Sequence, residues 1–426
     1  MRTPLNERYA LRTDFLDAYF SDYAITKKKI YVEVEYYIHL LYTVSNPPTL
    51  AESTNLRNIY KHFSMIDHMK ILEVEKLINH DVKAIEYFLR TKIDRHNYIH
   101  FGLTSQDINN TAIPLVLKEW FKNEYLPTIQ RLINAMESIC EYEKIPMLAR
   151  THGQVAVPTY LDKEIYVFVY RLQEQLKVLK NIPFTGKFGG AVGNLSAHKL
   201  AYPDVNWEKF ADNFLDYIGL KRQQYTTQVE NYDNLAAFFD GIKRVNTILL
   251  DFSKDIWQYI SMDYLSLKSI GYEVGSSTMP HKVNPIDFEN AEGNLGYANS
   301  IFSFFSEKLP ISRMQRDLSD STVLRNIGVP IAHTHIAIQS LIQGINKLAV
   351  NKEVINKDLD SNWQVLTEAL QILLRKEGFS NPYEDIKKES MGRTLSKENL
   401  HKIINNLKIE EELREKLLAL TPQNYI

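Results

Sequence analysis

The stretch LAAFFDGIKRVNTILLDFSKDIWQYI, residues 235–260, is the clearest indicator of fold class in this sequence. Its apolar side chains recur at steps of three and four residues over about seven turns, the period of an α-helix that buries one face. The repeat consists of Leu235, Phe238, Phe239, Ile242, Val245, Ile248, Leu249, Phe252, Ile256 and Ile260. Because helices average about 12 residues, we expect this one to belong to a bundle of long helices.

Three further segments show the same spacing of apolar residues, at 126–139, 161–179 and 338–348. Several long amphipathic helices in one chain are typical of a helix bundle, and stripes of this length also suggest a subunit interface. Strand signals are few and short. The sequence therefore predicts an all-α protein.

Segments that contain glycine and proline interrupt these helices at 149–158, 182–194, 268–285 and 308–322. Irregular segments between rigid helices are where binding groups usually lie. We therefore expect the functional residues to come largely from these segments.

The length of 426 residues is enough for two or three domains of ordinary size. The residues before about 100 indicate a small helical domain, and near residue 346 the long stripes give way to short, charged helical pieces. We predict an N-terminal helical domain at 1–100, a central long-helix bundle with the catalytic loop at 101–345, and a C-terminal helical domain at 346–426.

Composition and charge exclude several classes of protein. Apolar residues make up 44% of the chain, and the net charge of −2 lacks the basic excess of a nucleic-acid-binding protein. No run approaches the roughly 18 apolar residues of a membrane span, and residues 1–15 contain no apolar signal region. We therefore expect a cytoplasmic protein without nucleic-acid or membrane partners.

Metal and cofactor motifs are absent from the sequence. One cysteine and the lack of His-Glu-x-x-His exclude the common zinc sites. The glycines of GKFGGAVGN, residues 186–194, do not fit the dinucleotide-binding spacing, and no phosphate-loop motif occurs. We expect a protein that needs neither a metal nor an organic cofactor.

Residues 271–285, GYEVGSSTMPHKVNP, place two hydroxyls, a cation and an amide close together in the chain. Gly275 permits backbone angles that are closed to other residues, and Pro280 and Pro285 stiffen the ends of the segment. By composition alone, such a segment is more often a solvated turn than a site. The order of its residues is more informative.

The string from Gly275 to Pro285 resembles the signature of the fumarase/aspartase superfamily, Gly-Ser-Ser-x-Met-Pro-x-Lys-x-Asn-Pro, and it meets every fixed position. A match of so many fixed residue types is highly specific. Members share an all-α fold, with a long central helix bundle flanked by two smaller helical domains, and they eliminate fumarate or a related acid. The resemblance implies this fold and a lyase reaction, in agreement with the helix pattern.

Within the superfamily, the sequence resembles the bacterial form of the branch that cleaves succinylated purine nucleotides. This resemblance is carried by His281, the continuation at 286–296, Thr104-Ser105-Gln106-Asp107, and the segments 150–154 and 316–326. It runs from about Arg8 to Ile426; relatives continue for another short helix, so we expect the C-terminal packing to depart there. The alternatives are another lyase of the superfamily, for argininosuccinate or aspartate, and a non-catalytic helical scaffold.

The resemblance implies acid–base catalysis of C–N cleavage. Ser276 would be the base that removes the carbon-bound proton, with Ser277 as the competing assignment, because the sequence does not separate the two hydroxyls. A serine hydroxyl is a weak base at neutral pH, and the charge of Lys282 would favour the alkoxide. His152 would be the general acid for the departing purine nitrogen, since histidine titrates near neutral pH.

The resemblance also implies a shell of binding residues. Thr104 and Ser105 would donate to a succinyl carboxylate, and His80 would bind near the leaving group or phosphate, with an acid role as the alternative. Arg316 and Arg325 would hold the 5′-phosphate or a carboxylate, since guanidinium groups bind such oxyanions through paired hydrogen bonds. The full predicted shell is Arg8, Tyr9, Asn79, His80, Asp81, Thr104, Ser105, Gln228, Lys282, Val283, Asn284, Asn290, Arg316, Ser321, Thr322, Val323, Leu324 and Arg325.

In this superfamily three subunits build each site of a homotetramer. The resemblance therefore implies a homotetramer with shared active sites. The expected partners are small molecules, the succinylated purine nucleotides, and further copies of the same chain.

Overall fold

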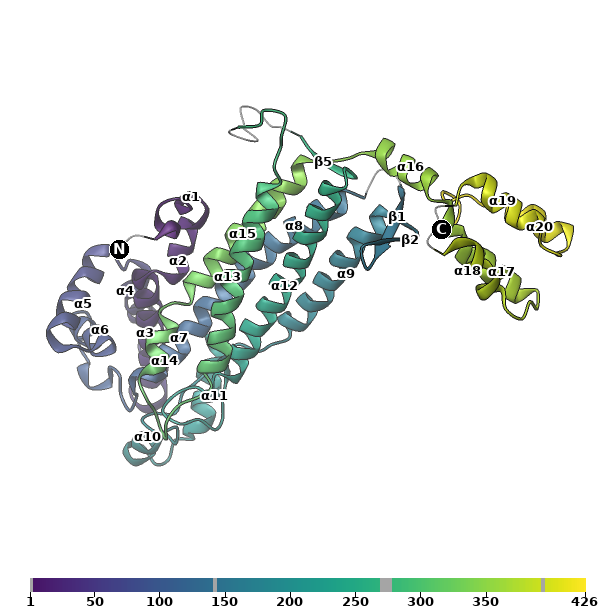
Figure 1. The fold of residues 1–426 in the computed structure, drawn as a ribbon. Coiled ribbons are helices and arrows are strands. Elements are labelled where there is room, and N and C mark those ends of the chain that lie inside the picture. The colour runs from purple at the N-terminus through teal and green to yellow at the C-terminus, as the bar shows by residue number, and fades with distance from the viewer. Residues whose placement is uncertain (1–2, 141–143, 269–277, 392–394) are drawn as a thin grey trace. The chain divides into compact units, whose positions relative to one another are not determined.

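The computed structural model describes residues 3–140, 144–268, 278–391 and 395–426, and helices make up most of these residues (Figure 1). The β structure in these ranges is limited to three sheets of two strands each. The predicted all-α class is therefore confirmed. The part of the predicted catalytic loop that contains Ser276 and Ser277, residues 269–277, lies outside the described residues.

The long apolar stripes of the sequence form the helices that we expected. The stripe at 235–260 lies in α12 (Asp233–Ser261), a helix of 29 residues. The other three stripes lie almost entirely in α8 (Leu126–Ser138), α9 (Leu161–Lys180) and α15 (Gly328–Lys347). A further long helix, α13 (Ile286–Lys308), follows the predicted catalytic loop.

Contacts divide the chain into two compact units, each built from separate segments. The first unit contains Met1–Gln130, Glu174–Leu250 and Ala291–Gln339, and the second contains Arg131–Gln173, Asp251–Asn290 and Ser340–Ile426. Both units include parts of the long helices, because helices such as α12 pass through a boundary. The three consecutive domains at 1–100, 101–345 and 346–426 stay a prediction.

The first unit adds further elements to its parts of the bundle helices, and the longest of them, α3, has 23 residues. They are α1 (Ala10–Thr13), α2 (Asp17–Phe20), α3 (Asp22–Val44), α4 (Leu50–Lys61), α5 (Met65–Ile78), α6 (Asp81–Arg90), α7 (Ser105–Trp120), α10 (Ser196–Ala201), α11 (Trp207–Tyr217), α14 (Ser319–Leu324), and the paired strands β3 (Thr185–Gly186) and β4 (Lys221–Arg222). A π-helical turn, Phe121–Tyr125, joins α7 to α8. The core of this unit includes the buried rings of Tyr36 on α3 and of Trp207 and Phe214 on α11.

In the first unit, α12 packs against α13 and α15 (Figure 1). The ring centroid of Phe239 on α12 lies 5.6 Å from that of Phe302 and 5.3 Å from that of Phe305, both on α13. The buried amide of Asn246 on α12 donates to the hydroxyl of Thr334 on α15 at 3.0 Å. These contacts bring the apolar faces together, as the bundle prediction requires.

The second unit contains the remaining strands and the C-terminal helices. β1 (Pro146–Thr151) pairs antiparallel with β2 (Gln154–Tyr160), and β5 (Leu265–Leu267) with β6 (Leu348–Val350). The helices are α16 (Lys352–Ser361), α17 (Thr367–Lys376), α18 (Pro382–Ser390), α19 (Lys397–Asn405) and α20 (Glu411–Leu418). The expectation of an irregular segment at 149–158 is wrong, because a tight turn at His152–Gly153 joins β-branched and apolar residues into a hairpin.

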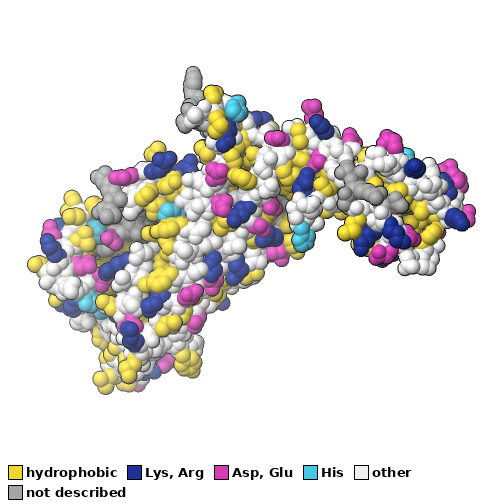
Figure 2. All heavy atoms as spheres, in the orientation of Figure 1, with side chains coloured by type: hydrophobic (Ala, Val, Ile, Leu, Met, Phe, Trp, Pro, Cys, Tyr) yellow, Lys and Arg dark blue, Asp and Glu magenta, His cyan; other side chains and the backbone are white. Residues whose placement is uncertain are grey.

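The surface shows mixed charge. Lys and Arg side chains are interspersed with Asp and Glu side chains over the face in Figure 2, in line with the net charge of −2. Among the helices that the structure describes, none combines the length and apolar content that a membrane crossing needs.

One carboxyl group in the core of the first unit is buried away from any cation that the described residues supply. Glu230 is 3% exposed, and its carboxylate accepts hydrogen bonds from the Thr185 hydroxyl at 2.9 Å and from the backbone N–H of Tyr232. Burial raises the pKa of Glu230 from 4.5 to about 7, against the opposing effect of these two hydrogen bonds. The folded protein therefore holds this proton more tightly than the unfolded chain does.

We predict that Glu230 makes stability depend on pH between 4.5 and about 7. Because the folded-state pKa is raised, the contribution of Glu230 is fully present below pH 4.5 and is lost as the pH rises through about 7. Glu230→Gln should remove this dependence, which thermal unfolding at a series of pH values would measure. The control is Glu412→Gln, a change of an exposed residue. A constant difference in melting temperature between wild type and Glu230→Gln would contradict the prediction.

Candidate functional site

The first cluster of predicted binding residues lies where α6 and α7 begin. Asn79 ends α5 in the left-handed conformation, with φ of 53°, and His80 caps the N-terminus of α6. The Nδ1 atom of His80 accepts from the backbone N–H of Lys83 at 3.0 Å, so a neutral ring carries its proton on Nε2. That atom faces the hydroxyl of Ser105 at 3.4 Å. The structure thus brings His80 and Ser105 together from segments 25 residues apart.

Asp81 follows His80 and is tied to the protein scaffold. Its carboxylate forms an ion pair with the ammonium of Lys29 on α3 at 2.7 Å. Burial alone would raise the pKa of Asp81, but the facing ammonium holds it below its usual value. Asp81 is therefore an anion that anchors the start of α6 to α3, which keeps the His80 ring in place.

The N-terminus of α7 carries Thr104 and Ser105, both half-buried. The backbone N–H of Thr104 donates to Asp107 Oδ2 at 2.8 Å, the interaction that usually starts a helix with Thr and an acid three residues later. Unpaired N–H groups and the helix dipole make the start of a 16-residue helix favourable for an anion. A carboxylate can therefore bind at Thr104 and Ser105.

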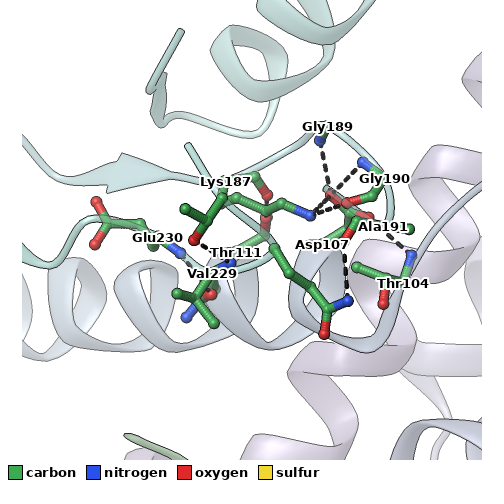
Figure 3. Close-up of polar contacts among 12 residues, drawn as sticks. Thr104, Asp107, Thr111, Lys187, Gly189, Gly190, Ala191, Val229 and Glu230 are labelled. Atoms are coloured by element: carbon green, nitrogen blue, oxygen red, sulfur yellow. Dashed lines mark hydrogen bonds and ion pairs between the residues drawn. The ribbon is translucent and has the colours of Figure 1, made fainter. Parts of the chain in front are cut away.

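Asp107 forms a fully buried ion pair with Lys187 (Figure 3). Asp107 Oδ1 accepts from Lys187 Nζ at 2.8 Å and from the N–H groups of Gly189 and Gly190 at 2.8 and 3.1 Å. Burial lowers the pKa of Lys187, and the Asp107 carboxylate opposes that shift. The pair fixes the loop after β3 to the first turn of α7, and this loop also contains Ala191.

The second cluster surrounds Arg316. Its guanidinium donates to Gln228 Oε1 at 3.3 Å and to the Ser321 hydroxyl at 3.4 Å. Gln228 is held in turn, because its side-chain amide donates to the carbonyl of Ala191 at 2.9 Å and its backbone N–H to the carbonyl of Gln315 at 3.1 Å. Arg316 is half-buried and forms no ion pair with any described residue, so its charge can bind an anion.

The remaining predicted residues of the first unit lie nearer the surface. Arg8 is exposed and Tyr9 half-buried in the turn before α1. On α14, Ser321 and Val323 are half-buried and Thr322 is exposed, whereas Leu324 packs inward. Arg325 follows α14 and is exposed.

In the second unit, His152 lies at the tip of the β1–β2 hairpin. His152 and Gly153 are the two residues between the last pair of the ladder, and both have positive φ, 53° and 73°. This is the backbone of a type I′ turn, which favours glycine at its second position. The turn therefore explains the order His-Gly in the motif, and it presents an exposed imidazole.

Arg150, two residues before His152, anchors this hairpin near its turn. Its guanidinium pairs with Asp358 on α16 at 2.9 Å, and Asp358 also accepts from the hydroxyl of Tyr264 and from the side-chain amide of Asn362. This contact holds β1, and with it the His152 turn, against α16.

The described end of the predicted catalytic loop also belongs to the second unit. Lys282 and Val283 are exposed, and Asn284 is half-buried. The backbone N–H of Lys282 bonds to the carbonyl of Met279 at 3.0 Å, which forms a turn before α13. Asn290 on α13 accepts from the hydroxyl of Ser340 on α15 at 2.9 Å.

The sequence predicted Asp81 and Gln228, but it did not identify Asp107 and Lys187 as residues that support the first cluster. The position of Asp107, three residues after Thr104, is a helix-start signal that could have indicated its role. Lys187 has no such signal, because it pairs with a residue 80 positions away in the chain.

We predict that Lys187→Met destabilises the protein by roughly 3–5 kcal/mol, because it leaves the buried Asp107 carboxylate without a counter-charge. The double change Lys187→Met and Asp107→Asn should recover part of that loss. Urea unfolding measures both. Lys199→Met is the matched control, since Lys199 and Glu208 form an ion pair with side chains 48% and 53% exposed, and it should cost less than about 1 kcal/mol. If Lys187→Met and Lys199→Met lowered the free energy of unfolding equally, burial of the Asp107–Lys187 pair would be unimportant.

The chain is similar to lyases over its whole length. It matches the family described as "Lyase" over residues 7–298 and the family described as "Adenylosuccinate lyase C-terminal" over residues 312–426. A relative from Dictyostelium discoideum, named adenylosuccinate lyase, is 46% identical over 100% of this chain and 96% of its own length. Relatives of the same name from Vibrio cholerae serotype O1 and Escherichia coli strain K12 are each 42% identical, over 100% of this chain and 96% of their own lengths.

Solved structures show a similar fold. A fumarate lyase from Mesorhizobium sp. BNC1 has a TM-score of 0.77 and 17% identity, covering 97% of this chain and 95% of its own. A β-carboxy-cis,cis-muconate cycloisomerase from Acinetobacter calcoaceticus sp. ADP1 has a TM-score of 0.73 and 15% identity, covering 99% of this chain and 97% of its own. At these identities the likeness concerns the fold alone, and it agrees with the long-helix bundle.

Proposed function

This chain belongs to the adenylosuccinate lyase family, and from that premise we propose which residues carry out the reaction. The enzyme is a C–N lyase that eliminates fumarate from adenylosuccinate and leaves AMP. The same elimination on the second succinylated nucleotide of purine synthesis, SAICAR, leaves AICAR. We further propose that the enzyme is cytoplasmic and needs no metal or organic cofactor.

The observation that best supports a site for this anionic substrate is the half-buried guanidinium of Arg316, which has no ion pair among the described residues. A cation in this position favours an anionic ligand. The N-terminus of α7, with Thr104 and Ser105, is a second favourable place for an anion in the same unit. A substrate with a phosphate at one end and succinyl carboxylates at the other requires two such places.

The chemistry demands a base, a source of positive charge and an acid. The base takes the proton from the carbon next to a succinyl carboxylate, and the electron pair left behind forms the new double bond of fumarate. The C–N electron pair leaves on the purine nitrogen, which takes a proton from the acid. The carbanion that forms between these steps is dianionic, so it needs a cation and hydrogen-bond donors nearby.

We assign the base to Ser276, with Ser277 as the alternative, and both lie outside the described residues. Lys282 and Asn284 follow them in the same loop and can neutralise or donate to the reacting carboxylate. The acid is His152, which lies in the turn at the tip of the hairpin and is exposed, so a ligand can reach its imidazole. His80 binds near the leaving group, where its Nε2 proton is directed at Ser105 or at a substrate atom in its place.

The remaining shell binds the nucleotide. Arg316 and Ser321 hold the phosphate, supported by Gln228. The other proposed contacts are Arg8, Tyr9, Asn79, Asp81, Val283, Asn290, Thr322, Val323, Leu324 and Arg325.

We propose that the protein is a homotetramer with shared sites. Exposed aromatic side chains on α9, Tyr166 and Tyr170, and on α12, Trp257, support self-association, because aromatic residues are enriched in protein interfaces. Light scattering after size exclusion should give a mass about four times the 49.6 kDa of one chain. A fully active species with the mass of a single chain would rule out shared sites.

The test of the reaction is an ultraviolet assay with adenylosuccinate, with argininosuccinate and aspartate in parallel. We expect loss of the succinyl-purine and appearance of fumarate with adenylosuccinate alone. His152→Ala should lower kcat by about 100-fold or more, the usual contribution of a general acid. The control is His62→Ala, a change of an exposed histidine after α4. Turnover of another substrate instead would keep the lyase chemistry and overturn the nucleotide assignment, and near-normal turnover by His152→Ala would overturn the acid.

A further inference from the structure

Gln106 lies on the first turn of α7, where it follows the proposed binding residues Thr104 and Ser105 and precedes Asp107 of the buried ion pair. Its side chain is buried, with 1% of the residue exposed. Its side-chain amide donates to Asp320 Oδ2 at 3.1 Å, across 214 positions of sequence. The contact therefore joins the first turn of α7 to the first turn of α14.

Asp320 lies next to the proposed phosphate site. It precedes Ser321, whose backbone N–H donates to Asp320 Oδ1 at 2.7 Å. The hydroxyl of Tyr232 donates to Asp320 Oδ2 at 2.7 Å, and that hydroxyl accepts from the side-chain amide of Asn110 at the same distance. Asp320 is 6% exposed, and the described residues supply it with hydrogen-bond donors but no ion pair.

If the contact between Gln106 and Asp320 served only to stabilise the fold, it would cost folding free energy. A buried carboxylate without a counter-charge loses solvation energy that hydrogen bonds only partly restore. Gln106 adds to the cost, because its Oε1 atom is buried and has no hydrogen-bond partner among the described residues. Apolar side chains of the same volume would avoid both costs. The relative placement of α7 and α14 therefore explains the contact better than stability does.

The contact is the direct link between the two clusters. Ser105 and Thr104 lie within two residues of Gln106, and Arg316 donates to Ser321, the neighbour of Asp320. Two indirect connections also exist: one runs from Asn110 on α7 through the Tyr232 hydroxyl to Asp320, and the other from Asp107 through Gly190 and Ala191 to Gln228. The second of these passes through a loop that contains glycines with positive φ, Gly190 and Gly193, whereas Gln106 and Asp320 join two helical turns by one direct contact.

We propose that Gln106 and Asp320 are positioning residues that set the distance between the carboxylate-binding end and the phosphate-binding end of the site. Together they select ligands that carry both anionic groups at one separation. This inference rests on the proposed function, because it takes Thr104–Ser105 and Arg316–Ser321 as the two ends. It adds a specificity role for two residues that do not themselves contact the substrate.

The test is Gln106→Met, which keeps the length and volume of the side chain and removes the amide. We expect the KM for adenylosuccinate to rise about tenfold, the size of one hydrogen bond to a charged partner, with kcat changed less than about threefold. The inhibition constants of AMP and of fumarate should each change less than about threefold, since each ligand occupies only one end. A general loss of folded enzyme would lower apparent kcat and leave KM unchanged.

The matched control is Tyr232→Phe, which removes a different donor from the same Asp320 oxygen and leaves the contact with Gln106 in place. It should lower the melting temperature while the KM for adenylosuccinate stays within about threefold of wild type. Gln106→Asn, whose amide is one carbon shorter, serves if Gln106→Met does not fold. It should show the same rise in KM.

The outcomes separate the inference from the function on which it rests. A parallel rise in the KM for adenylosuccinate and the inhibition constant of AMP would reduce Gln106 to a local support of the phosphate end and overturn the proposal. An unchanged KM in both Gln106 variants, or an equal rise in Tyr232→Phe, would also overturn it. If wild type does not cleave adenylosuccinate, the proposed function itself fails, and the two-ended assignment fails with it.

Discussion

The buried ion pair between Asp107 and Lys187 is the contact on which the arrangement of the first unit depends. Removing two charges from water costs several kcal/mol for each ion, and the attraction between them repays this only if further hydrogen bonds complete their shells. Asp107 meets that condition with N–H groups from Thr104, Gly189 and Gly190 as well as the ammonium. Because a backbone N–H can donate in only one direction, the N–H groups of Gly189 and Gly190 leave little freedom in how the loop after β3 meets α7.

The same pair shapes the electrostatics of the proposed site. Asp107 neutralises Lys187 below the surface, so the positive charge left for a ligand comes from Arg316 and from the N–H groups at the start of α7. The loop that Asp107 holds then supports Gln228 through the carbonyl of Ala191, and Gln228 supports Arg316. The buried ion pair thereby links the start of α7 to the position of Arg316, which lies more than 100 residues later in the sequence.

In the second unit the controlling constraint is backbone conformation. His152 and Gly153 both need positive φ to close a two-residue hairpin turn, and the right-handed twist of the strands favours that turn. The cost of the left-handed conformation at a histidine is offset by strand pairing and by the anchor at Arg150 and Asp358. The proposed acid is thus held on a rigid hairpin, so its imidazole has a defined position from which to meet a ligand.

The amino-acid sequence by itself determined the all-α class, the presence of the long helices α8, α9, α12 and α15, and the superfamily, although its apolar stripe at 338–348 covers only the second half of α15 (Gly328–Lys347). Helix periodicity is a local property, and the string from Gly275 to Pro285 is contiguous, so both can be read without tertiary structure. The domain limits and the residue roles stay predictions, and Ser276 lies outside the described residues. Only the tertiary structure decided the hairpin at 146–160, where short strands gain stability by pairing with each other. The partners of Asp107 and Gln106 were decided in the same way, because contacts across 80 and 214 positions leave no periodic trace in the sequence.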